Sequence, residues 1–171
     1  MLRAPSVTDA AMKIEYQIIH SEEFNSDHRK LVAEMLAEQG KVKGNLKDKI
    51  DRCKLLCIVK VDDKVVAIGA IKKQTKSDFN SEKAGLPSLS DEFKWELGYL
   101  YTRPDYGRKG VGSNVVKLLI DNYGNGRLMA STEIAANPAM VKILERNGFR
   151  SYGKPWTSGV HDHFLGLFLK F

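Results

Sequence analysis

The chain has 171 residues, of which 43% are hydrophobic, so it is long enough for one globular domain with a substantial core. No apolar run reaches the ~20 residues that a membrane-spanning helix needs, and residues 1–11 lack the charged start and apolar block of a secretory signal. We therefore expect a cytoplasmic protein with a flexible leader or tag-like tail over residues 1–11 and a single domain over residues 12–171.

The formal net charge is +6, which raises the question of a polyanionic partner. The Lys and Arg residues are scattered, and the stacking aromatics of an RNA-binding module are missing, which argues against nucleic acid and against a membrane surface. Cys53 and Cys57 have no second Cys pair or His cluster nearby. This spacing argues against a metal site and predicts free thiols.

Periodicity and turn residues predict alternating strands and helices. In chain order we expect a strand over 12–19, helices over 27–39 and 45–53, strands over 54–61, 64–72 and 95–102, a helix from 113 to about 122, a strand over 127–132, a helix from 137 to 147, and strands over 149–152 and 163–171. The polar stretch 73–92 is too long for a tight hairpin loop, and such loops tend to carry function or to be mobile. Gly69, inside a predicted strand, indicates a close neighbour or a β-bulge.

The most informative stretch is residues 95–120, which predicts a strand, a glycine-rich turn and an amphipathic helix. Pro104 ends the strand because it lacks a backbone donor, and Gly107, Gly110 and Gly112 allow a tight turn and a close approach of the backbone to a ligand. The free amides at the start of the helix, with the positive end of its dipole, form an anion site suited to a phosphate.

Arg108 and Lys109 add positive charge at this anion site. The pattern is not a P-loop, which needs Gly-Lys before Ser/Thr, because here Ser113 follows Gly112 directly. It also lacks the third glycine of the dinucleotide-binding fingerprint. What remains is Arg-Pro-x-Tyr-x-x-x-Gly-x-Gly after a Leu-Tyr strand, and this resembles the acetyl-CoA-binding motif of the GNAT N-acetyltransferase superfamily.

The resemblance covers nearly the whole chain. The family usually has Arg/Gln-x-x-Gly-x-Gly/Ala, whereas here Gly107 takes the first position and Arg108 is displaced by one, which weakens one side-chain contact and leaves the backbone cradle. A second motif, from Asn137 to Phe149, resembles the family's Asn-x-x-Ala-x-x-x-Tyr-x-x-x-Gly-Phe helix. The predicted element order, β-α-α-β-β-β-α-β-α-β-β, also matches the family.

This resemblance implies an α/β (α+β type) GNAT fold, with a central mixed, mostly antiparallel sheet of six to seven strands and about four helices. It implies an enzyme that transfers the acetyl group of acetyl-CoA to a primary amine of a small molecule, protein or peptide, by direct attack in a ternary complex. Two alternatives are a catalytically silent acyl-CoA-binding or regulatory domain and an acetyltransferase acting on aminoacyl-tRNA. Members of the family often form homodimers, but no interface is evident in the sequence.

The family's cofactor contacts can be carried over by position. In the family, a bulge in the strand before the glycine loop separates that strand from the next one, and pantetheine lies in the gap. The implied acetyl-CoA-binding residues are Leu100, Tyr101, Thr102, Arg108, Lys109, Gly110, Val111, Gly112, Ser113 and Asn137. Asn137 is equally well explained as a plain helix cap, and both roles can hold together.

The resemblance also implies catalytic roles. The backbone amide of Leu100 would stabilise the developing oxyanion. Glu96 lies four residues earlier, and a glutamate at this offset is the general base, directly or through water, in the histone-lysine branch of the family. The alternative to this role is that Glu96 is a strand-edge carboxylate paired with a surface lysine.

The general acid is where the chain departs from the family. Leu144 occupies the position that often carries a tyrosine near the sulfur, and leucine cannot donate a proton. Tyr152 is the first substitute that we predict, and His161 and His163 are further candidates, although a lone histidine is more often a surface residue. The sequence shows neither an acidic cluster for a polycationic acceptor nor a clear peptide groove, so the acceptor stays open.

Overall fold

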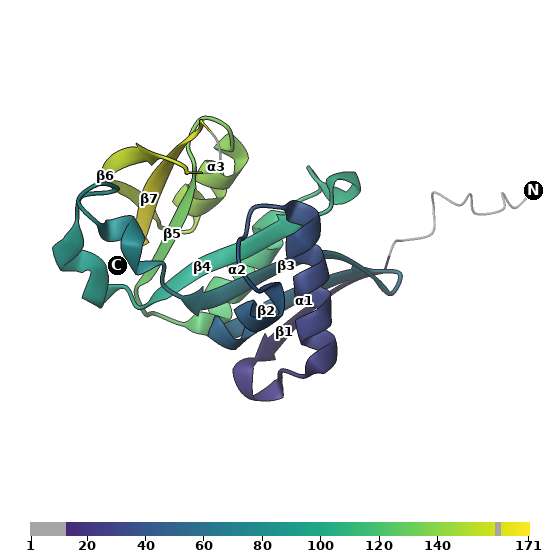
Figure 1. Cartoon of the computed structure of the whole chain (residues 1–171). Helices are drawn as coiled ribbons and strands as arrows, with labels where there is room; N and C mark the ends of the chain where they lie inside the picture. The colour runs from purple at the N-terminus through teal and green to yellow at the C-terminus, as the bar shows by residue number, and fades with distance from the viewer. Residues whose placement is uncertain (1–12, 160–161) are drawn as a thin grey trace, which may run out of the picture.

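The computed structural model describes residues 13–159 and 162–171, which form one sheet with helices on both faces (Figure 1). The predicted leader, residues 1–11, and His161 lie outside the described residues. The strands are β1 (Ile14–His20), β2 (Cys53–Val61), β3 (Lys64–Lys73), β4 (Trp95–Thr102), β5 (Leu128–Glu133), β6 (Arg150–Thr157) and β7 (Phe164–Lys170). The α-helices are α1 (Ser26–Gln39), α2 (Val111–Tyr123) and α3 (Pro138–Arg146). Short 3-10 helices are η1 (Ser21–Glu23), η2 (Leu46–Arg52), η3 (Lys76–Phe79), η4 (Pro87–Glu92) and η5 (Pro104–Tyr106).

The sheet has seven strands in the order β1-β2-β3-β4-β5-β7-β6. All neighbours are antiparallel except β4 and β5, which are parallel and share a single pair of facing residues, Glu96 and Met129. Beyond this pair the two strands diverge and divide the sheet into an N-terminal arm (β1 to β4) and a C-terminal arm (β5, β7 and β6) (Figure 1). The predicted mixed, mostly antiparallel sheet is confirmed.

A β-bulge interrupts β4 just after it leaves β5. The register between β3 and β4 shifts across Gly69, so that Tyr99 and Leu100 together oppose this one glycine. Tyr99 has a φ of 51°, in the left-handed region that few non-glycine residues adopt. A Cβ at Gly69 would lie 2.5 Å from Val115 Cγ1 and 2.7 Å from Leu100 Cδ2. Both interpretations of Gly69, the bulge and the close neighbour, are confirmed.

Gly69→Ala is therefore expected to destabilise the protein. The added methyl group overpacks the contact between β3, the bulge and α2, which should cost about 1–3 kcal/mol and lower the melting temperature by roughly 2–4 °C per kcal/mol. Gly159→Ala is the matched control, because a Cβ there meets nothing within 4 Å. Thermal unfolding of both variants tests this, and a Gly69→Ala variant as stable as Gly159→Ala would contradict the packing described.

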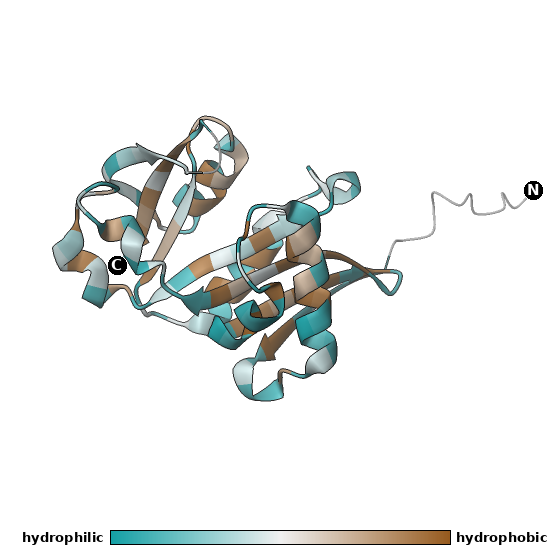
Figure 2. Cartoon of the chain, viewed as in Figure 1, coloured by the Kyte–Doolittle hydropathy of each residue, from teal (hydrophilic) through white to brown (hydrophobic). Residues whose placement is uncertain are grey.

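The core lies on both faces of the sheet. On one face α1 and η2 contribute buried residues such as Val32, Leu36 and Ile50. On the other face α2 packs through Val115 and Leu119. Figure 2 shows hydrophobic residues along the central strands and hydrophilic residues on the outer side of α1. Helices α1 and α2 thus pack on opposite faces of the N-terminal arm.

The polar stretch 73–92, predicted to be functional or mobile, is anchored to the core. It contains η3 and η4, and Phe79 at its centre is fully buried, as is Phe93 just after it. The two rings stack with their centroids 6.2 Å apart and belong to a cluster with Met129 and Trp156. The polar composition of the stretch hides these two aromatic anchors.

Three predicted boundaries are corrected by the structure. The predicted helix over 45–53 is the 3-10 helix η2. Helix α2 begins at Val111 rather than at 113, because Gly110 adopts a φ of 78° and serves as its N-cap. Strand β6 continues to Thr157 through a register shift after Tyr152, where a loop over 153–162 was predicted. None of the helices in the described residues is long and apolar enough to cross a membrane.

Candidate active site

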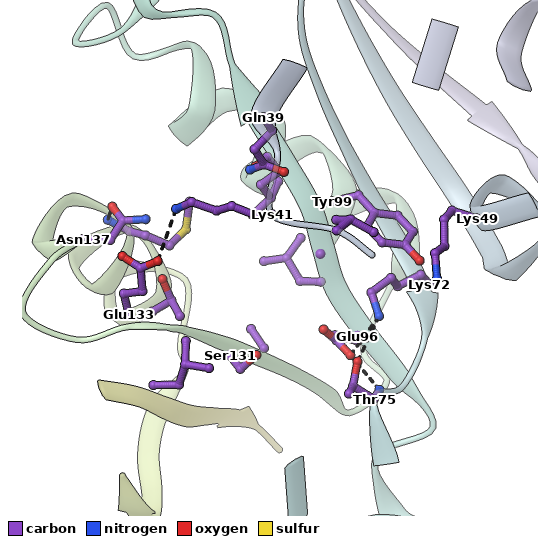
Figure 3. A pocket seen from close by; sticks show the side chains of 18 of the residues that line it. Gln39, Lys41, Lys49, Lys72, Thr75, Glu96, Tyr99, Ser131, Glu133 and Asn137 are labelled. Carbon is purple, nitrogen blue, oxygen red and sulfur yellow. Dashed lines mark hydrogen bonds and ion pairs between the residues drawn. The ribbon is translucent and has the colours of Figure 1, made fainter. Parts of the chain in front are cut away.

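Where β4 and β5 diverge, a pocket of about 500 Å³ lies between the two arms of the sheet (Figure 3). Residues 96–100 of β4 line one side and residues 130–133 of β5 line the other. The segment from the end of α1 through η2 contributes further residues, as do the end of β3 and the start of α3. The bulge and the loss of strand pairing thus create the pocket.

Glu96 lies in this pocket as half of a buried ion pair. Its Oε1 atom is 3.0 Å from Nζ of Lys72, and the two side chains are only 8% and 6% exposed. The same oxygen accepts the backbone N–H of Thr75 at 2.7 Å. Lys72 and Glu96 face each other across β3 and β4, so the sheet register makes this pair. Figure 3 shows the second carboxylate oxygen turned into the pocket.

This geometry corrects the alternative in which Glu96 is a strand-edge carboxylate paired with a surface lysine. The carboxylate of Glu96 is paired with a lysine, as that alternative had it, but Lys72 is buried rather than on the surface, and Glu96 itself lines the pocket. The assignment of Glu96 as general base stays a prediction.

The bulge brings Leu100 to the pocket wall, where its carbonyl accepts a hydrogen bond from Nε2 of Gln39 at 2.9 Å. Past Glu96 no described strand pairs with β4 on its β5 side, so an extended ligand could hydrogen-bond to the backbone there. Tyr101 and Thr102 follow on this same stretch and are half-buried. The predicted pantetheine contacts are thus placed along one edge.

The predicted anion site lies at the start of α2. Gly110 caps this helix through its backbone, and no side chain caps it. A Cβ at Gly112 would meet only Thr102 Oγ1, at 3.7 Å, so the approach to these amides is open. Arg108 and Lys109 are exposed beside them. A helix start without a side-chain cap and with two cations beside it fits a diphosphate such as that of acetyl-CoA.

Val111 and Ser113 complete the predicted cradle. Val111 is buried and anchors the helix to the core, so it can offer a ligand only its backbone, whereas Ser113 is half-buried. Residues 108–113 would therefore hold the diphosphate mainly through main-chain N–H groups.

Asn137 is a helix cap and also lines the pocket. Its Oδ1 accepts the backbone N–H of Met140 at 3.3 Å, which confirms the cap, while its contact with the cofactor stays a prediction. Leu144 lies about two helical turns after Asn137 on α3 and is buried in the pocket wall. The apolar side chain therefore stands at the pocket itself and can supply no proton there.

The structure does not bring Tyr152 to this pocket. Tyr152 lies on β6, and its ring packs against Phe171 with the centroids 5.4 Å apart. His163, the other described candidate, is likewise not among the residues that line the pocket. Tyr152 was placed from its position after the Gly-Phe motif, and the face of an outer strand cannot be read from such spacing.

Sequence reasoning missed a second buried carboxylate behind the pocket. Asp78 of η3 is 8% exposed at its side chain and lies 3.5 Å from Nζ of Lys83. Burial, and then the charge of Glu96, raise the pKa of Asp78 from 3.8 to about 6. The predicted free thiols are confirmed: Cys53 and Cys57 are buried, and burial raises the pKa of each to about 12.

The raised pKa of Asp78 predicts a pH-dependent stability. The folded state holds this proton up to about pH 6, whereas the unfolded chain loses it near 3.8, so the free energy of unfolding falls as the pH rises between these values. Asp78→Asn keeps the shape and cannot ionise. We expect it to be about 1–3 kcal/mol more stable than the wild type at pH 7.5 and similar near pH 4.

Urea unfolding at both pH values measures this difference. The control is Asp91→Asn, which removes an exposed carboxylate 3.1 Å from Nζ of Lys76 and should change stability by less than about 1 kcal/mol at either pH. An Asp78→Asn variant that is less stable than the wild type at pH 7.5 would refute the account of Asp78.

The fold and the pocket define a class of protein: a single sheet that opens between two strands next to the start of a helix. A family match covers residues 15–149, and the chain belongs to the acetyltransferase (GNAT) family. It is accordingly an acyltransferase of the acetyl-CoA-dependent N-acetyltransferase type. Comparison with curated proteins gives no match.

Solved structures of the same fold are numerous. An acyl-CoA N-acyltransferase from Pseudomonas aeruginosa superposes with a TM-score of 0.67 and 9% identity, over 93% of this chain and 100% of that one. NAA60 from Arabidopsis thaliana, in complex with a bisubstrate analogue, gives 0.64 and 11%, over 93% and 98%. A further Arabidopsis thaliana structure with the bisubstrate analogue CoA-Ac-MVNAL gives 0.64 and 12%, over 91% and 98%. The TM-scores show a shared fold, and at identities this low the likeness extends to the fold alone.

Proposed function

We propose that this protein transfers the acetyl group of acetyl-CoA to a primary amine in the pocket between β4 and β5. The observation that carries the proposal is that β4 and β5 share only one residue pair among the described residues and then separate. This separation leaves the sheet open beside the start of α2, which has no side-chain cap. The thioester of acetyl-CoA supplies the activated acetyl group. Residues 108–113 would bind its diphosphate, and residues 100–102 would bind its pantetheine arm.

Leu100 and Glu96 would carry the transfer itself. The backbone amide of Leu100 donates to the carbonyl oxygen as negative charge develops there, and one such donor can contribute about 3 kcal/mol. The amine nitrogen forms a bond to the acetyl carbon while the carbon–sulfur bond breaks. The amine's proton passes to Glu96, through the carboxylate oxygen that Figure 3 shows turned into the pocket, or to a water beside it. CoA leaves as a thiolate that takes its proton from solvent, because Leu144 stands where a donor would be needed.

A base is needed because an alkyl amine with an ordinary pKa near 10.4 is neutral only on the order of one part in a thousand at pH 7. The experiment that tests the proposal incubates the protein with acetyl-CoA and a panel of primary amines, and follows both free CoA and the acetylated amine by mass spectrometry. Equal amounts of the two products support the proposal. No CoA released with any amine, combined with no binding of acetyl-CoA, would refute it.

A further inference from the structure

The charges that line the pocket are unbalanced. Five cationic and two acidic side chains line it. Both acids are already paired with a lysine of the same pocket: Glu96 with Lys72 at 3.0 Å and Glu133 with Lys41 at 3.4 Å. The three cations that remain are Lys43, Lys49 and Arg52. In the described part of the chain none of these three forms an ion pair.

The structure restrains Arg52 by hydrogen bonds and places Lys49 beside Gly44. Arg52 ends η2, and its guanidinium donates to the backbone carbonyls of Lys73 and Gln74 at 3.4 and 3.3 Å. Lys49 passes close to Gly44, where its Nζ atom lies 3.3 Å from the position that a Cβ would take. Gly44 has a φ of 92°, so the turn and the path of the lysine both suit glycine at this position.

A neutral donor lies beside these cations. Tyr99 lines the pocket at the bulge, and burial raises the pKa of its hydroxyl to about 12, so it stays protonated and can donate. Figure 3 shows Tyr99, Lys49 and Lys72 on one side of the pocket, with Glu96 beside Lys72, and Asn137 on the other side. A group bound near Lys49 therefore lies on the same side of the pocket as Glu96, opposite Asn137, one of the predicted cofactor contacts.

We propose that the acetyl acceptor is a small anionic amine, whose own carbon chain carries a carboxylate or a phosphate that Lys49 and Arg52 bind while the amine faces Glu96. This inference rests on the proposed function. The size follows from the cavity: about 500 Å³ must hold both the end of the pantetheine arm and the acceptor. The ion pair of Lys41 with Glu133 also crosses from the segment after α1 to β5 and narrows the pocket (Figure 3).

The test measures binding to the CoA-loaded enzyme by calorimetry, with amines that differ only in the anion. The pairs are 3-aminopropanoate with 3-aminopropanamide, and O-phosphoethanolamine with ethanolamine. Because charge-assisted hydrogen bonds are the strong ones, we expect at least one anionic member to bind about tenfold tighter than its neutral partner or more. Which pair shows the preference decides between carboxylate and phosphate. Equal affinities in both pairs, or no binding of any of the four amines, would overturn the inference.

Substitutions test which residues produce the preference for anionic amines. Lys49→Met and Arg52→Met should each remove most of the preference for the anion, whereas Lys49→Arg, which keeps the charge, should retain it. Lys47→Met, an exposed lysine of η2 that does not line the pocket, is the control and should bind as the wild type does. Thermal stabilisation by CoA should be the same in all four variants. Loss of CoA binding by the wild type would refute the proposed function, whereas CoA binding without an anion preference would refute only the inference.

Discussion

Gly112→Trp is expected to abolish acetyl-CoA binding, with an affinity loss of about a hundredfold or more, equivalent to about 2.7 kcal/mol. The reason is steric: the nearest atom that a Cβ at Gly112 would meet is Thr102 Oγ1, at 3.7 Å, so an indole has room there and would occupy the place proposed for the diphosphate, over the amides of the first turn of α2. Gly112 is a better test than Gly110, because the φ of 78° at Gly110 would strain any larger residue.

Two matched variants accompany this substitution. Gly112→Ala should still bind acetyl-CoA, because its Cβ would make only an ordinary contact of 3.7 Å with Thr102 Oγ1. Lys117→Trp places the same bulky side chain at an exposed position further along the same helix and should bind as the wild type does. Calorimetry with acetyl-CoA measures all three. A Gly112→Trp variant with wild-type affinity would mean that the diphosphate is not held at this helix start.

Glu96→Gln is expected to lower kcat by roughly a hundredfold to a thousandfold, because the amide cannot accept the amine's proton. Binding of acetyl-CoA should be unchanged, since the proposed cofactor contacts are residues 100–102 and 108–113 and do not include the Glu96 side chain. The glutamine oxygen can still accept from Lys72 and from the N–H of Thr75, but the buried ammonium of Lys72 loses its counter-charge, so the variant should also have a lower melting temperature. Steady-state release of CoA and thermal stabilisation by acetyl-CoA separate the two effects.

The control for this variant is Glu38→Gln, which removes a carboxylate 3.0 Å from Nε of Arg103, outside the pocket. It should leave kcat within a factor of about two, because exposed ion pairs contribute little. A Glu96→Gln variant with wild-type kcat would exclude Glu96 as the base and leave the ion pair with Lys72 a purely structural role. A protein that only binds acyl-CoA would show no turnover to lose.

Much of the fold could be predicted from the sequence because it is encoded locally. Gly69 indicated the bulge, and Gly107, Gly110 and Gly112 after Pro104 indicated the turn before α2. These residues act through backbone conformation, which sequence neighbours determine.

The ion pair of Lys72 with Glu96 could not be predicted in the same way. The two residues face each other only in one register of β3 and β4, and residues 74–94 separate these strands. A shift of one residue would have turned Glu96 to the other face of the sheet. Strand order has a similar effect on Tyr152: β6 is an edge strand, separated from β5 by β7, so Tyr152 does not line the pocket. The register decides which face a strand residue occupies, and spacing after a motif does not reveal it.

The positions of the two pocket cations Lys49 and Arg52 depend on tertiary contacts rather than on sequence neighbours. Lys49 and Arg52 belong to η2, which the sequence predicts as a helix, but their arrival at the pocket depends on how the segment after α1 folds over the end of β3. Phe79 and Phe93 illustrate the same point, because their burial depends on contacts with β5 and β6 far along the chain. Such contacts are set by the tertiary structure.

Thermal unfolding with acetyl-CoA, CoA, ATP and NAD, each at the same concentration, tests the central claim most directly. At about a hundred times its dissociation constant a ligand adds about 2.7 kcal/mol, which should raise the melting temperature of a domain of this size by about 5–10 °C. The structure predicts this shift with acetyl-CoA and CoA and a negligible one with ATP and NAD. No shift with acetyl-CoA, or equal shifts with all four ligands, would contradict an acetyl-CoA site at the start of α2.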